Sequence, residues 1–167
     1  MNAPVDWIPT GIPGLSIHPE TLLAQVVDDD AARAALAGAN PVEQVMIHVA
    51  RGDVSTAAEL VTETRLVDPQ NFPMRVVDAD VVRASGDPER AIKRLRSLID
   101  EFKDTGHEAV LQQQLGVLYY TVGDYHAAVT RFRTALELRT TAGDEAFRIE
   151  ISRRSLAAAQ ARATAVR

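Results

Sequence analysis

Histidine and acidic side chains are the groups in this sequence that could bind a metal ion or transfer protons. The four histidines are His18, His48, His107 and His126. No two of them stand at i and i+4, and no HExxH motif occurs, so a zinc site is not predicted. The run Asp28-Asp29-Asp30 would place its carboxylates about 100° apart on a helix, where they rarely converge on one ion. Because acidic groups favour a helix N-terminus, we interpret this run as a helix start.

Motifs for other catalytic chemistry are also missing from the sequence. It has no glycine-rich phosphate loop and no G-x-S-x-G nucleophile turn. The lack of cysteine excludes disulfides and thiolate zinc ligands. Arg51-Gly52-Asp53 matches a cell-adhesion tripeptide, but its position predicts a helix-ending glycine followed by a capping aspartate. We therefore expect a non-enzymatic protein with no cofactor, no catalytic residues and no metal site.

Composition and charge are those of an ordinary globular protein. The chain has 167 residues, enough for one domain or one short array, with 46% hydrophobic and 25% charged residues. Its net charge of -5 argues against nucleic acid as the main partner. The N-terminal residues lack the basic and apolar segments of a signal peptide, and no stretch approaches the roughly 18 apolar residues of a membrane span. We expect a cytoplasmic protein without membrane contact.

Residues 1–17 contain three prolines and two glycines among apolar residues. This spacing forbids a regular helix, and the apolar content is high for a disordered tail. We expect an extended arm that lies on the surface and packs against the first helices. The alternative is that the arm occupies a groove and competes with a ligand there.

Residues 18–39 are predicted to be an N-terminal helical segment. The sequence His18-Pro19-Glu20 suits a helix start, because proline is favoured in the first helical turn. Apolar residues follow at helical spacing. A second helix, residues 31–37, is predicted to start at the acidic run and to end at Gly38. These two helices would cap the structure or form a degenerate pair.

The stretch from Leu115 to Leu136 has the clearest helical pattern. Apolar residues recur at helical spacing on both sides of Gly123-Asp124, which predicts two amphipathic helices facing each other. Glycine can take the left-handed conformation that ends a helix, and aspartate can cap the next one. Two more Gly-Asp joints stand at 52–53 and 86–87, so the spacings are 34 residues (52 to 86) and 37 residues (86 to 123). We place the three extra residues in the loop 103–107.

The residues after each joint recur as well. Alanine stands four residues after each aspartate, at Ala57, Ala91 and Ala128. A larger residue follows four positions later, at Val61, Leu95 and Phe132. The small residue lets two helix backbones approach, and the larger one fills the space against the next pair. The first helix of the series is predicted to begin at Asn40, with Glu43 completing a capping box.

A period of 34 residues with this signature resembles the tetratricopeptide repeat family. The match is strongest in residues 109–142, at Leu115, Gly116, Tyr119, Tyr125, Ala128, Phe132 and Ala135. Two further repeats are residues 38–71 and 72–105. The resemblance implies an all-α fold, an α-solenoid of antiparallel helix pairs with three repeats over residues 40–142. Because one helix pair cannot bury its apolar face alone, about three must stack for stability.

Residues 143–167 are predicted to be a capping helix for this stack. Apolar residues form two seams along it, and pairing of these seams with a second copy would give a homodimer as an alternative function. Arg148 to Arg167 holds five arginines and one acidic residue, so a regulator that contacts nucleic acid is a second alternative. We favour a third interpretation, in which the arginines stabilise the helix end and cover apolar surface with their stems.

The family resemblance implies a protein–protein interaction module. In that family, the first helices of successive repeats line a concave groove that takes an extended or helical peptide. The matching positions here are Val42, Met46, Val49, Val76, Asp80, Arg83, Gln113, Val117 and Tyr120. This lining is mostly apolar, so we expect an apolar or amphipathic partner segment. Charged substitutions of Val117 and Tyr120 are expected to abolish partner capture and to leave helicity intact.

Overall fold

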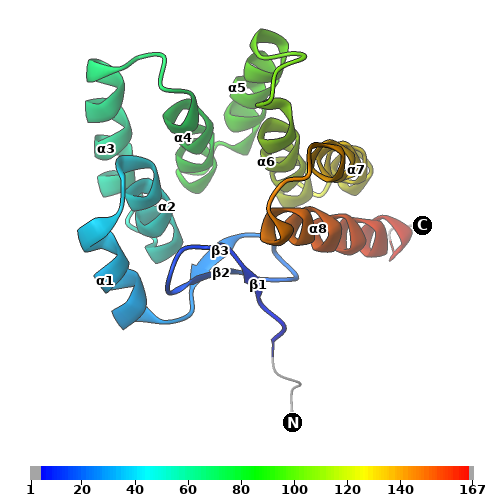
Figure 1. The fold of residues 1–167 in the computed structure, drawn as a ribbon, viewed down its shortest axis with the longest axis horizontal. Coiled ribbons are helices and arrows are strands. Elements are labelled where there is room, and N and C mark those ends of the chain that lie inside the picture. The colour runs from blue at the N-terminus through cyan, green and yellow to red at the C-terminus, as the bar shows by residue number, and fades with distance from the viewer. Residues whose placement is uncertain (1–4, 166–167) are drawn as a thin grey trace.

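The structure of the protein, a computed structural model, describes residues 5–165. Residues 1–4 of the predicted arm and residues 166–167 of the predicted capping helix lie outside the described residues. Within the described range, the chain forms eight α-helices and one sheet of three short strands (Figure 1). The prediction of a mainly helical protein is confirmed, whereas the sheet is a feature that the sequence patterns did not predict.

The strands precede all of the helices. They are β1 (Ile8–Pro9), β2 (Leu15–Ile17) and β3 (Ala24–Val26). The helices are α1 (Asp29–Gly38), α2 (Pro41–Arg51), α3 (Val54–Val67), α4 (Phe72–Ala84), α5 (Pro88–Glu101), α6 (Glu108–Thr121), α7 (Tyr125–Ala142) and α8 (Ala146–Ala165).

Capping groups set the ends of these helices. At the start of α2, the Asn40 side chain accepts a 3.0 Å hydrogen bond from the Glu43 amide, and the Glu43 carboxylate accepts a 3.1 Å bond from the Asn40 amide. Asp87 and Asp124 cap α5 and α7 in the predicted way. The joint glycines all have left-handed backbones, with φ of 83°, 95° and 82° at Gly52, Gly86 and Gly123.

Asp53 is the exception among the predicted capping aspartates. Its side chain makes no hydrogen bond to the amides of α3. The Asp53 Oδ2 atom lies instead 3.6 Å from His48 Nδ1 and 3.7 Å from Arg51 Nε. The prediction of a capping role was wrong at this position, because the carboxylate pairs with the two cationic or polar groups at the end of α2.

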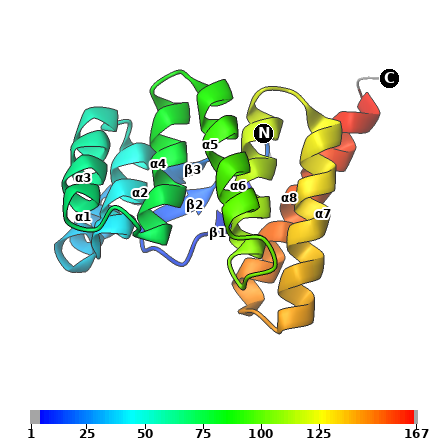
Figure 2. The same ribbon diagram turned by 90° about the horizontal axis from the view of Figure 1, so that it is seen from above.

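Three helix pairs, α2/α3, α4/α5 and α6/α7, follow one another in a curved row (Figure 1, Figure 2). The first helix of each pair lies on the inner side of the curve, and the second lies on the outer side. Helix α1 packs against α2 at one end of the row, and α8 packs against α7 at the other. The row therefore has one inner surface, formed mainly by α2, α4 and α6.

Each pair is held by an apolar cluster that uses equivalent residues. Ala57, Ala91 and Ala128 are completely buried at the same place in α3, α5 and α7. Four residues later, Val61, Leu95 and Phe132 are buried as well. In the third pair the Phe132 ring packs directly on Gly116, where a Cβ atom would lie 2.6 Å from the ring.

The N-terminal residues form an antiparallel sheet in the order β1-β2-β3. Ile8 pairs with Ile17, and Leu15 pairs with Val26. The predicted helical segment 18–39 is therefore correct only for α1, and the helix predicted to start at Pro19 is absent. Pairing of β2 with β3 overrides the helical pattern here, and Leu22 takes a left-handed backbone with φ of 57° that no helix contains.

The sheet lies between the two ends of the curved row, with β3 against α2 and β1 against α8 (Figure 1). On one side, Leu15 packs in a cluster with Ala32 of α1 and Ile47 of α2. On the other, Ile8 and Leu22 pack in a cluster with residues of α6, α7 and α8. The described part of the predicted arm turns back on itself to pair β1 with β2, and its residues Ile8 and Leu15 are part of the core rather than of a surface arm.

Candidate interaction surface

The nine predicted groove residues come from α2, α4 and α6, the three helices of the inner side. On α2, Val42 and Val49 pack into the apolar cluster between α2, α3 and α4. Met46 is partly exposed and belongs to none of the apolar clusters of the described residues. On this helix, Met46 alone has the surroundings expected of a groove residue.

On α4, the groove positions are Val76, Asp80 and Arg83. Val76 is buried in the cluster between α4, α5 and α6. Arg83 Nε donates a 2.6 Å hydrogen bond to Asp80 Oδ1, so these two charged groove positions pair within the chain. The Asp80 side chain is 36% exposed and the Arg83 side chain 13% exposed, so the carboxylate is the more accessible partner.

On α6, Gln113 is buried and serves as a structural contact to α8. Its Nε2 donates to Ser155 Oγ at 3.2 Å, and its Oε1 accepts from Ser152 Oγ at 2.8 Å. Arg139 Nη1 donates a further 2.9 Å hydrogen bond to Ser152 Oγ. Burial lowers the pKa of the Arg139 guanidinium, and Asp144, 3.8 Å from Nε, opposes this effect. The prediction that Gln113 lines an open groove is corrected, because α8 covers it.

Tyr120 and Val117 of α6 are covered by the N-terminal residues. The Tyr120 side chain is buried, and its hydroxyl donates a 2.8 Å hydrogen bond to the Glu20 carbonyl. Val117 packs against the cluster that contains Ile8 and Leu22. Charged substitutions at these two positions would therefore disrupt packing, which corrects the expectation that they leave the helical fold intact.

Arg154 of α8 fixes the start of the N-terminal segment. Its Nη2 donates to Asp6 Oδ2 at 2.9 Å, and its Nη1 donates to the Trp7 carbonyl at 3.3 Å. Trp7 packs edge-on against His18, with 5.0 Å between the ring centroids. Neither Asp6 nor Arg154 was predicted to be a functional residue, since their sequence positions, 148 residues apart, carry no signal of the contact.

Two other arginines of α8 also have acidic partners within the chain. Arg148 pairs with Glu145, and Arg153 pairs with Glu150. The apolar side chains Ile151, Leu156 and Ala158 pack against the cluster of α6, α7 and the N-terminal segment. Both alternative functions stay predictions, and Arg148, Arg153 and the apolar side chains named above are engaged in contacts within the chain.

The outer side carries a second group of polar residues that sequence reasoning missed. The buried Asp78 of α4 accepts hydrogen bonds at Oδ2 from Arg65 of α3, at 2.8 Å, and from Arg94 of α5, at 2.6 Å. These residues line a cavity of about 420 Å³ that Leu66 also borders. One signal was present in the sequence, because Asp78 interrupts the apolar stripe of α4.

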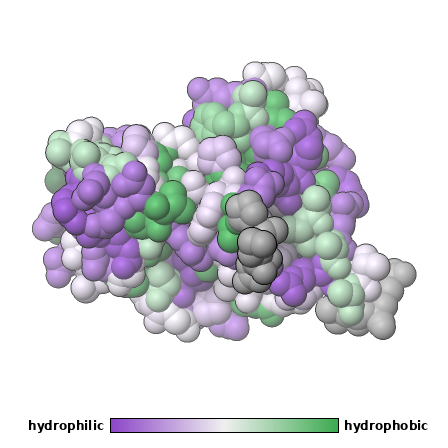
Figure 3. Space-filling model, turned by 90° about the horizontal axis from the view of Figure 1, so that it is seen from below, coloured by the Kyte–Doolittle hydropathy of each residue, from purple (hydrophilic) through white to green (hydrophobic). Residues whose placement is uncertain are grey.

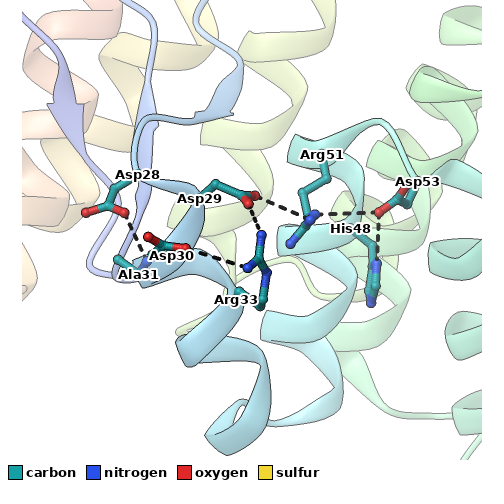
Figure 4. A network of polar contacts seen from close by, with 8 residues as sticks. All are labelled: Asp28, Asp29, Asp30, Ala31, Arg33, His48, Arg51 and Asp53. Carbon is teal, nitrogen blue, oxygen red and sulfur yellow. Dashed lines mark hydrogen bonds and ion pairs between the residues drawn. The ribbon is translucent and has the colours of Figure 1, made fainter.

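The acidic run and His48 belong to a chain of ion pairs that joins α1 to α2 (Figure 4). Asp28 caps α1 by accepting a 3.0 Å hydrogen bond from the Ala31 amide, as predicted. Asp29 pairs with Arg33 and, at 3.3 Å, with Arg51. The run is therefore used for capping and ion pairing, which agrees with the interpretation from sequence.

Viewed from the side of the N-terminal segment, the surface alternates between hydrophilic areas and small hydrophobic patches (Figure 3). No continuous apolar groove is visible on this face outside the grey atoms. Most of the apolar lining predicted for the inner side is packed within the protein. Three of the apolar clusters contain these residues, which are Val42, Val49, Val76, Val117 and Tyr120.

No known protein-family model matches this chain, and no curated protein matches it. Residues 5–165 contain no group of three or more histidine or acidic side chains placed to hold a metal ion. None of the eight helices described is both long and apolar enough to cross a membrane.

Proposed function

We propose that this chain is a tetratricopeptide-like module that binds a segment of a partner protein on its inner side. The observation that carries this proposal is the threefold recurrence of one helix pair. Each pair is joined by a glycine with a left-handed backbone, and each second helix buries an alanine at the same distance after the joint. Stacked helix pairs of this kind create extended concave surfaces that bind other proteins.

The available part of the inner side is formed by α2 and α4. Met46 and Asp80 retain exposure there, whereas α6 is covered by α8 and the N-terminal segment. A partner segment that presents an apolar side chain to Met46 and a polar or basic group to Asp80 complements this surface. This is an amphipathic partner, as the sequence predicts.

Charge introduced on the inner side tests the proposal. Met46→Glu places a carboxylate in the proposed contact, whereas Leu66→Glu makes the same change at an exposed position of the outer side. Proteins captured from a lysate by the unmodified chain are expected to be retained by Leu66→Glu and lost by Met46→Glu, as judged by mass spectrometry. Circular dichroism checks that both variants keep their helicity.

The opposite pattern counts against the proposal. If the captured proteins are lost from Leu66→Glu and retained by Met46→Glu, the partner binds the outer side. If both variants retain them, the partner binds elsewhere on the chain.

A further inference from the structure

The most unusual contact of the molecule is the one between its first described residues and its last helix. Ile8 is almost completely buried in a cluster with Tyr120 of α6, Phe132 of α7 and Ala159 of α8. Two residues earlier, the carboxylate of Asp6 is held by Arg154, while the rest of the Asp6 side chain is exposed. An extended segment is thus bound through one acidic and one aliphatic side chain.

This mode of contact is that of a peptide bound to a helical surface. Arg154 supplies charged donors to the Asp6 carboxylate and to the Trp7 carbonyl, so both a side chain and the main chain are recognised. The apolar cluster supplies a pocket for Ile8. Successive side chains of an extended segment point to opposite sides, and residues two apart point to the same side. The spacing of Asp6 and Ile8 therefore lets one surface contact both side chains.

The bound residues are weakly connected to the rest of the sheet. Strand β1 has only two residues, and one of them, Pro9, has no amide hydrogen to donate to β2. Gly11 follows with φ of 85°, a backbone that most other residues avoid. By contrast, β2 is anchored through Leu15 to α1 and α2. Rotation near Gly11 would release residues 6–9 without displacing Leu15, which anchors β2.

We propose that the surface formed by α6, α7, α8 and Leu22 is a peptide-binding site that Asp6–Pro9 keeps occupied. Its external ligand is an extended segment of a partner protein with an acidic residue two positions before a branched aliphatic residue. That ligand replaces Asp6 at Arg154 and Ile8 in the apolar cluster. This inference rests on the proposed interaction role of the inner side and specifies how part of that side is regulated.

Release of the segment can be followed directly, because Trp7 is the single tryptophan of the chain. We call the contact of Asp6–Pro9 with this surface the latch. The variants Asp6→Lys and Arg154→Glu each place two like charges together there. Asp6 is exposed enough to be changed without disturbing the core. Both variants are expected to shift the Trp7 emission to longer wavelength, as solvent reaches the indole. Unchanged emission in both variants would show that the segment stays in place and would overturn the proposal.

Peptide binding tests the site itself. The probe is a fluorescein-labelled synthetic peptide that copies residues 5–12, and binding is measured by fluorescence anisotropy. Full-length Asp6→Lys is expected to bind this peptide at least about tenfold more tightly than the unmodified chain does, a difference of about one unit in log Kd. The control peptide carries Asp in place of its isoleucine corresponding to Ile8, and it is expected to show no such gain.

Exchanging the charges at position 154 of the chain and at the Asp6 position of the peptide tests whether the charged pair is recognised. The alternative is that the peptide adheres to exposed apolar surface regardless of charge. The Arg154→Glu chain is expected to bind the copied peptide poorly and to bind a peptide with lysine at the position of Asp6 well. Equal affinity of both peptides for this chain would overturn the proposal. If a variant proves unstable in thermal unfolding, Asp6→Ala removes the charge contact alone and is expected to give a smaller gain in peptide affinity.

The two proposals fail in different ways. If Asp6→Lys folds but binds the peptide no better than the unmodified chain, only the latch is rejected, because Met46 lies outside this site. If peptide binding behaves as expected while Met46→Glu retains every captured protein, the latch stands and the α2–α4 contact is rejected.

Discussion

Two regions of this molecule share the same helix-pair design but differ in what surrounds the helices. The closed region consists of α6, α7 and α8 with the N-terminal sheet, and side chains from all three helices are buried against Ile8 and Leu22. The open region consists of α3, α4 and α5, and it carries a cavity of about 420 Å³ beside the exposed Leu66. The contrast shows that the joint and alanine pattern specifies a helix pair. It does not determine whether other segments of the chain cover the surface of that pair.

The polar groups of the two regions show the same contrast. In the closed region, Gln113, Ser152 and Arg139 are nearly inaccessible, and Ser152 hydrogen-bonds both Gln113 and Arg139. In the open region, Arg65 and Arg94 share Asp78 while their own side chains are 40% and 33% exposed. Loss of a partner should therefore cost more where water cannot replace it.

The largest difference is expected for apolar truncations. Phe132→Ala empties the space above Gly116 in the closed region, and such a change costs about 3–5 kcal/mol of unfolding free energy. Leu66→Ala in the open region should stay within about 0.5 kcal/mol, because Leu66 contributes little buried surface. Urea unfolding followed by circular dichroism measures both values. A cost at Leu66 comparable to that at Phe132 would show that the outer side is covered in solution.

A smaller difference is expected for the polar networks. Gln113→Leu keeps most of the side-chain volume but removes the partner of Ser152 and Ser155, which should cost about 1–3 kcal/mol. Asp78→Asn weakens two ion pairs whose arginines can become hydrated, so its cost should be at most about 1 kcal/mol. The same unfolding experiment compares them. The contrast between the regions breaks down if Asp78→Asn is the more destabilising of the two changes.

The smallest effect concerns acid stability at the edge of the open region. Hydrogen bonding from Arg75 lowers the pKa of Glu101, so this ion pair stabilises the fold above the ordinary glutamate pKa. That contribution is lost as the pH falls through the lowered pKa. Glu101→Gln should thus reduce the loss of stability on acidification, measured as Tm between neutral pH and about pH 3. An identical pH profile of the variant would show that the exposed pair contributes nothing.

Local signals in the sequence were sufficient to predict the helices of the row. The left-handed glycines at positions 52, 86 and 123 and the capping box at Asn40 act within one turn of chain, so their effect can be predicted from neighbouring residues. The buried alanines follow from the same pattern. These predictions succeed because the interactions concerned span only a few residues.

The predictions for the N-terminal residues and for α6 failed for the opposite reason. Nothing near Leu22 indicates that its backbone is left-handed, since the cluster that holds its side chain comes from α6, α7 and α8. Similarly, Tyr120 is covered by the carbonyl of Glu20, 100 residues away in the sequence. A periodic pattern can show that a helix face is apolar, but it cannot show which distant segment buries it.

The contact between Arg154 and Asp6 also has a consequence for the order of folding. The helix pairs can form as each emerges during synthesis, because their contacts are local. Strand β1 cannot find its site until α8 has been made, so a segment that is synthesised before the eight helices is among the last to be placed. Until then its buried residues, including Ile8, are exposed on the nascent chain, and this interval is when the protein is most open to capture by a chaperone or by a second copy of itself.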